Sequence, residues 1–154
     1  MRGIITIVLL FMAAVVLAAD TSTYNFAFKT DSRDKYITAD NRPMVYIGEA
    51  SNWTLSATWE PWSENSAIRL IHSVIQYKEP KKTDINQIAF QRIYSYGFID
   101  CRLNQLFILN EYYTTQQDLI VLHNKFQPGE YAVDMEASKI LQTFLFYTCK
   151  AESV

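Results

Sequence analysis

The chain has 154 residues, with 14 basic and 16 acidic side chains and a formal net charge of -2. A chain of this length predicts a single domain. Its mildly acidic, evenly mixed charge argues against nucleic acid or anionic lipid headgroups as the main partner, because such partners require clustered basic side chains.

The N-terminus has the pattern of a secretory signal peptide. A basic residue precedes an almost unbroken apolar run over residues 4–19, and a polar stretch follows it. Small residues at the end of the run predict cleavage after Ala18 or Ala19. The alternative is an uncleaved anchor, but the run is shorter than the roughly 20 residues that span a bilayer. We therefore expect a signal peptide at 1–19 and one secreted β-rich domain at 20–154, which is not an integral membrane protein after cleavage.

Apolar and polar side chains alternate in several segments, which predicts β-strands with one wet face. The alternation is clearest at residues 53–59 and recurs at residues 24–29 and 131–137. Residues 68–77 and 140–149 are apolar on both faces and rich in β-branched and aromatic side chains, which predicts central strands. Proline and glycine between these runs predict turns.

The spacing of these segments favours an all-β, antiparallel β-sandwich over alternating strands and helices. A lipocalin-like β-barrel is the alternative. Residues 100–113 also fit a helical stripe of apolar side chains, so one short helix is allowed there.

Two features of the mature chain suit an oxidising compartment. The only two cysteines, Cys101 and Cys149, predict one disulfide bond, which stabilises by roughly 4 kcal/mol in the chain-entropy model. The sequon Asn52-Trp53-Thr54 predicts an N-glycan on Asn52, on the polar face of its strand.

No catalytic or metal-binding pattern appears in the sequence. The two histidines, His72 and His123, belong to no close-spaced ligand motif, and His72 shares a predicted strand face with apolar residues. Asp134 and Glu136 point to one face of a strand, as in any solvated strand, so an acid and base pair is not favoured. We predict no enzyme, no metal site and no cofactor.

Aromatic residues make up 14% of the chain, which suggests a lined cavity or an adhesive surface. Arg92 interrupts a period-2 aromatic stripe and therefore points in the same direction as its rings. An edge arginine stacked on tyrosine is the simpler interpretation of Arg92, and an anchor for an anionic group is the functional one. The candidate ligand-binding residues are Phe90, Arg92, Tyr94, Tyr96 and Phe98.

The segment NKFQPGEYAV at residues 124–133, followed by an apolar run ending at Cys149, resembles the last hairpin of the ML (lipid-recognition) family. This family of secreted β-sandwich proteins includes ganglioside-activator-like and insect chemosensory members. The resemblance covers about a fifth of the chain and implies two sheets that open to hold a lipid tail. Family members usually carry two or three disulfides, whereas this chain has two cysteines, and no ligand-contacting residue is carried over.

Together these observations predict a secreted, non-enzymatic binding protein for a lipid or another small hydrophobic ligand. The alternative is a secreted protein-binding factor, such as a venom, salivary or reproductive-tract component, which acts on an extracellular protein through exposed aromatic side chains.

Overall fold

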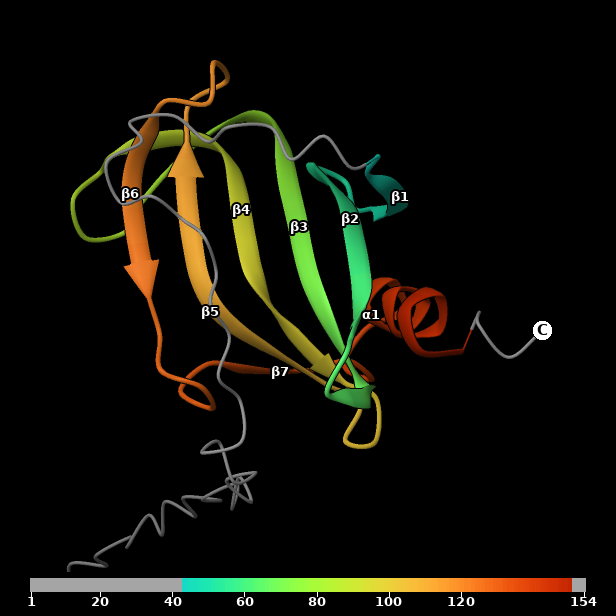
Figure 1. The fold of residues 1–154 in the computed structure, drawn as a ribbon. Coiled ribbons are helices and arrows are strands. Elements are labelled where there is room, and N and C mark those ends of the chain that lie inside the picture. Colours follow the sequence, from blue (N-terminus) through green and yellow to red (C-terminus); the bar gives the residue numbers. More distant parts are fainter. Residues whose placement is uncertain (1–42, 151–154) are drawn as a thin grey trace, which may run out of the picture.

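The structure is a computed structural model that describes residues 43–150. Within this range the chain forms seven β-strands followed by a short helix near its C-terminal end (Figure 1). The predicted signal peptide at 1–19 and the strand predicted at 24–29 lie outside the described residues, so both stay predictions.

The seven strands pair antiparallel in one sheet of order β1-β2-β3-β4-β5-β6, with β7 also paired to β5. The all-β antiparallel class is therefore confirmed, and the strands predicted at 53–59 and 68–77 are parts of β2 and β3. Because β1 and β6 stand at opposite ends of this order and do not pair, the sheet is not closed, and the barrel alternative is wrong. The strands are β1 (Val45–Glu49), β2 (Trp53–Trp62), β3 (Asn65–Lys82), β4 (Ala89–Asp100), β5 (Gln105–Thr114), β6 (Ile120–Lys125) and β7 (Ala132–Asp134).

A helix forms the second layer of this sandwich-like fold. Residues 140–149 are not a strand as predicted, because α1 (Lys139–Leu145) and a π-helical turn (Phe146–Lys150) occupy this segment. An apolar run of this length fits a buried strand and a buried helix equally well. A helix-capping residue favours the helix over the strand. Ser138 is the N-cap, and its Oγ accepts a hydrogen bond from the backbone N of Leu141 at 3.3 Å.

The short helix allowed at 100–113 is also wrong, because a tight turn and β5 occupy these residues. The Asp100 carboxylate accepts a hydrogen bond from the backbone N of Arg102 at 2.9 Å, which starts the turn. Asn104 ends it with a φ of 53°, a conformation that asparagine tolerates. Of the apolar side chains that fit a helical stripe, Leu103 lies in the turn, and Leu106 and Phe107 of β5 belong to separate buried clusters.

A β-bulge in β5 lies opposite Gly97 of β4. The register of these strands shifts between Tyr96 and Gly97, so Leu109 is the extra residue in β5. A Cβ atom on Gly97 would lie 2.0 Å from the backbone oxygen of Phe107. The two backbones approach so closely that no side chain fits at this position.

Two strands share the second edge of β5. β6 pairs with its C-terminal half, and β7 pairs with its first three residues. The connection between β6 and β7 leaves the sheet between these pairings. The backbone N of Phe126 donates to the oxygen of Leu109 at 2.8 Å, and the backbone N of Ile108 donates to the oxygen of Tyr131 at 3.0 Å. The strand predicted at 131–137 is thus confirmed only over the three residues of β7.

The main hydrophobic core lies between the sheet and α1. Phe144 and Leu145 of the helix belong to one buried cluster with Leu55 of β2 and Ile71 of β3. The Phe144 ring lies 6.5 Å from the ring of Trp59. We call the face of the sheet that carries Leu55 and Ile71 the helix-side face, and the other face the opposite face.

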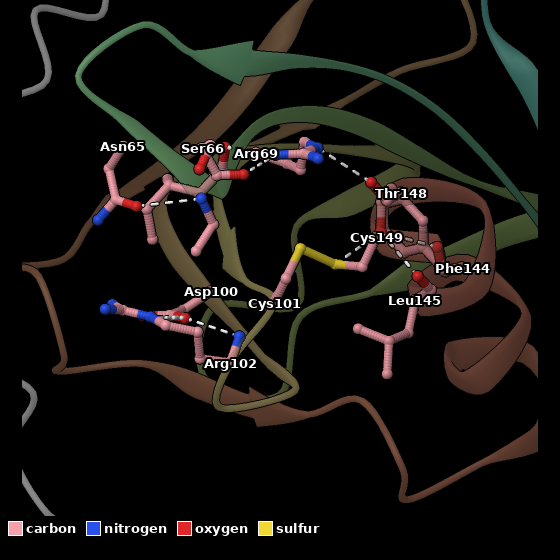
Figure 2. The surroundings of a disulfide bond; sticks show 12 residues. Asn65, Ser66, Arg69, Asp100, Cys101, Arg102, Phe144, Leu145, Thr148 and Cys149 are labelled. Atoms are coloured by element: carbon pink, nitrogen blue, oxygen red, sulfur yellow. Dashed lines mark hydrogen bonds and ion pairs between the residues drawn. A yellow bond between two sulfur atoms is a disulfide. The ribbon is translucent and has the colours of Figure 1, made fainter. Parts of the chain in front are cut away.

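The predicted disulfide between Cys101 and Cys149 is present (Figure 2). It joins the end of β4 to the π-helical turn after α1. The Nε atom of Arg69 in β3 donates to the backbone oxygen of Thr148 at 3.1 Å, and a cation at this end of a helix is favourable. A covalent bond and a charge-assisted hydrogen bond therefore fix the C-terminal end of the helical segment to the sheet.

Candidate ligand-binding site

The structure divides the five predicted ligand-binding residues among different surroundings. Arg92, Tyr94, Tyr96 and Phe98 alternate along β4 and lie on the opposite face. Phe98 is fully buried in a small apolar cluster there, which makes it a core residue. The ring of Phe90 instead packs against aromatic rings of the helix-side face. We therefore find no single site that contains all five.

Arg92 already has an anionic partner within the chain. Its Nη1 atom lies 2.7 Å from Oδ1 of Asp118, in the turn between β5 and β6. The hydroxyl of Tyr94 donates to the same oxygen at 2.7 Å. Burial, together with the hydrogen bond to Asp118, raises the pKa of Tyr94 to about 12. The guanidinium is thus committed to Asp118, which counts against the anchor for an anionic group.

Tyr96 belongs to a row of rings that crosses four strands on the opposite face. It stacks on His72 at 4.2 Å and meets Tyr112 edge to face at 5.8 Å, and Tyr112 stacks on His123 at 4.2 Å. His123 is further held by Asn110, whose Oδ1 lies 3.0 Å from Nε2. His72 is buried, as predicted for a core or boundary residue. Within the part of the chain that the structure describes, no three His, Cys, Asp or Glu side chains gather as a metal site.

The sequence reasoning missed a buried carboxylate on the helix-side face. Glu111 of β5 is only 7% exposed. Its Oε2 accepts a hydrogen bond from the hydroxyl of Tyr113 at 3.2 Å, and the side-chain amide of Asn124 in β6 also bonds to it. Burial raises the pKa of Glu111 above its ordinary value. One signal was present in the sequence: a lone acidic residue in a strand that is otherwise almost free of charge.

Aromatic side chains gather beside this carboxylate. The Phe90 ring meets the ring of Tyr113 at 4.9 Å and that of Tyr77 at 5.7 Å, both edge to face. Burial first, and the charge of Glu111 second, raise the pKa of Tyr77 and Tyr131, and the same two causes raise that of Tyr113 to about 12. We call these six residues the Glu111 cluster: Tyr77, Phe90, Glu111, Tyr113, Asn124 and Tyr131.

A row of small side chains leads across the helix-side face to Glu111. Ala57 of β2 pairs with Ser73 of β3, Ser73 pairs with Ser95 of β4, and Ser95 pairs with Glu111. Packed layers stand roughly 10 Å apart, a distance that alanine and serine side chains do not bridge. All four side chains of this small-residue row are nevertheless buried, and Ala57 belongs to the main hydrophobic core.

Asn52 lies in the turn between β1 and β2, directly before β2 begins. Its backbone oxygen accepts a hydrogen bond from the backbone N of Lys78 at 2.9 Å, and the residue is exposed. Asn52 itself therefore stands in an exposed turn, while Trp53 and Thr54 of the sequon are the first two residues of β2. Glycosylation of Asn52 stays a prediction.

Asp134 and Glu136 both take part in the turn that leads to α1. Oδ1 of Asp134 accepts a hydrogen bond from the backbone N of Glu136 at 2.9 Å, and Oε1 of Glu136 accepts one from Asn104 at 2.9 Å. Both residues are exposed. These contacts explain the two carboxylates as turn residues and assign them no chemistry.

No protein-family model, no curated protein and no solved structure matches the chain. The resemblance to the ML family stays a prediction. The segment that carries it forms the end of β6, a turn and β7, and the apolar run after it is helical where the resemblance implies a strand. No helix among residues 43–150 is long and apolar enough to cross a membrane.

Proposed function

We propose that the protein is a secreted, non-enzymatic binding protein for a small, mostly apolar ligand, which binds on the helix-side face at the Glu111 cluster. The observation that carries the proposal is the buried carboxylate of Glu111 beside aromatic rings. Burial penalises the charged form of a carboxylate, so this arrangement is not explained by stability. Ionisable groups with perturbed pKa values gather at functional sites, and ligand sites are apolar with a few placed polar groups.

The small-residue row supports the same location. Ala57, Ser73 and Ser95 lie in three neighbouring strands, and large side chains, Leu55 and Tyr113 among them, occupy the next row of the sheet. These small side chains are buried, so an apolar ligand that lies along them takes the place of the groups that now cover the row. Glu111 stands at one end of the row, where it contacts one end of such a ligand.

The contacts of Glu111 favour binding over catalysis. Its two hydrogen-bond partners are the phenol of Tyr113 and the amide of Asn124. The amide of Asn124 is not a nucleophile. The phenol of Tyr113 is a poor one at neutral pH, because its pKa is raised to about 12. The polar groups of the cluster are suited to orienting a ligand.

Secretion is supported by three features of the chain. The apolar run at residues 4–19 has the pattern of a signal peptide. The Cys101–Cys149 disulfide is of a kind that persists in oxidising compartments. The exposed sequon at Asn52 suits a protein that passes through the secretory pathway.

Expression in a eukaryotic secretory host is expected to give a protein with one N-glycan on Asn52. Treatment with peptide N-glycosidase should lower its mass by one glycan, and Asn52→Gln should abolish the shift. Thr54→Ser, which keeps the sequon, is the matched control and should retain the glycan. A secreted wild-type protein whose mass does not change on treatment would show that Asn52 is not used.

The location of the site is tested with a neutral fluorescent probe, N-phenyl-1-naphthylamine. We expect its fluorescence to rise on binding, and Ser95→Leu, which fills the small-residue row, to weaken binding by about tenfold or more. Ser56→Leu is the matched control, since Ser56 lies on the opposite face of β2. A thermal melt of each variant checks its fold. No binding by the wild type, or equal weakening by both variants, would contradict the proposal.

The alternative of a protein-binding factor is supported by a different surface. Phe146 and Tyr147 are exposed at the end of the helical segment, with their rings 6.0 Å apart. Aromatic side chains in such positions serve as anchors in protein interfaces. Replacement of both by serine should abolish binding to an extracellular partner if this alternative holds, and should leave binding of the neutral probe unchanged.

A further inference from the structure

The carboxylate of Glu111 has no basic partner within the described part of the chain. Two arginines of the sheet have other partners: Arg92 pairs with Asp118, and Arg69 binds a backbone oxygen. The groups in the described part of the chain that donate hydrogen bonds to Glu111 are the neutral side chains of Tyr113 and Asn124. Among residues 43–150, no positively charged side chain is therefore paired with this buried carboxylate.

The rings beside Glu111 are of the kind that bind cations. The face of an aromatic ring attracts a positive charge, most strongly when the cation is desolvated. One cation already lies at the border of the cluster, where Nζ of Lys81 is 5.9 Å from the ring centroid of Tyr77. A carboxylate together with several rings is the combination by which proteins recognise ammonium groups.

We propose that the ligand is an organic ammonium ion, with an apolar body that lies along the small-residue row and a positively charged nitrogen that pairs with Glu111. The inference rests on the proposed function, because it assigns the ligand class of the same site. Phe90, Tyr113 and the hydroxyl-bearing ring of Tyr77 surround the nitrogen, while Ser73 and Ser95 lie beneath the apolar body.

Charge pairing accounts for the presence of a buried acid in this position. An ammonium group compensates the buried carboxylate, whereas a neutral ligand of the same shape leaves its charge uncompensated. The site therefore discriminates between ligands by charge as well as by size. A negatively charged ligand, such as a fatty acid, meets like charge at Glu111 and is rejected.

The pH dependence of binding follows from the burial of Glu111. In the free protein its pKa is raised because burial disfavours the charged form. An ammonium ligand favours that form, so binding releases a proton wherever Glu111 is protonated. Affinity for the ammonium ion should rise as the pH rises through the pKa of free Glu111 and then level off, whereas affinity for a neutral ligand should not rise.

The test compares n-octylamine with 1-octanol by isothermal titration calorimetry on the full mature protein. These ligands share an apolar chain and differ in charge. We expect the amine to bind about tenfold more tightly or better at neutral pH. Glu111→Gln, which keeps the size of the side chain, should remove this preference without weakening the binding of octanol. Glu136→Gln is the matched control, because Glu136 lies in an exposed turn, and it should retain the preference.

The outcomes separate this inference from the proposed function. Equal affinities for both ligands, or a preference that persists in Glu111→Gln, would overturn the ammonium assignment even if the neutral probe still binds at the small-residue row. Failure of the neutral probe, octanol and octylamine alike would overturn the proposed function itself. The fold of Glu111→Gln is checked by its thermal melt at each pH.

Discussion

Replacement of Cys101 and Cys149 by serine is expected to lower the free energy of unfolding by about 4 kcal/mol. The bond closes a loop with a sequence separation of 48 residues, so its loss gives the unfolded chain much more freedom. The folded state changes as well, because the helical segment is then tied to the sheet at this end by the hydrogen bond from Arg69 to Thr148 (Figure 2).

Urea denaturation followed by tryptophan fluorescence measures this effect. Trp59 lies beside Phe144 of the helix and reports on the contact between the two layers. Wild-type protein treated with a reductant is the control, and it should match the double variant. A loss of less than about 1 kcal/mol would show that the bond constrains the unfolded chain far less than its loop length implies.

Gly97→Ala is expected to destabilise the fold by about 3 kcal/mol, a large effect for the addition of one methyl group. The new Cβ atom would lie 2.0 Å from the backbone oxygen of Phe107, so β4 and β5 must separate at the bulge. Backbone atoms in a paired strand have little freedom to give way. The variant should also weaken ligand binding, because Gly97 and Ser95 lie on the same face of β4.

Gly48→Ala is the matched control for this prediction. A Cβ on Gly48 would lie 3.5 Å from Cγ1 of Ile140, an ordinary contact. Its free energy of unfolding should therefore stay within about 1 kcal/mol of the wild-type value. Chemical denaturation of both variants measures the difference. A similar loss of unfolding free energy in the two variants would mean that the clash at Gly97 does not cause the destabilisation.

The pH dependence of stability provides an independent check on Glu111. Its pKa is raised in the folded protein, so its contribution to stability is complete below the pKa of the unfolded chain and is lost as the pH rises through the folded value. Glu111→Gln removes this titration. Wild-type stability should fall relative to the variant as the pH rises from acidic to neutral, and parallel curves would contradict the burial of a titrating carboxylate.

Local alternation was sufficient to predict much of the sheet. The pattern at residues 53–59 gave the correct faces of β2, because its tryptophans pack against the core while Ser56 lies on the other face. The disulfide was predictable from an even pair of cysteines and a signal-like N-terminus. These features depend on short-range patterns or on composition.

The remaining errors have two causes, an overlooked helix cap and contacts between distant strands. Residues 140–149 have no polar face, so periodicity alone did not distinguish a strand from a helix, and the cap at Ser138 was the decisive signal. The cluster around Glu111 joins β3, β4, β5 and β6, and its register is set by pairings that no local pattern reveals. Phe90 was predicted as a site residue in the company of Arg92, but β3 bulges beside it and its ring joins Tyr113 instead.

The division of one sheet edge between β6 and β7 has a consequence for solubility. A long, straight edge strand is a template on which another chain adds its own strand, and this is how β-proteins aggregate. Here that edge is interrupted between six residues of β6 and three residues of β7, where the chain turns away (Figure 1). Neither piece offers a continuous ladder of free amide groups, so this border of the molecule resists the growth of intermolecular sheets.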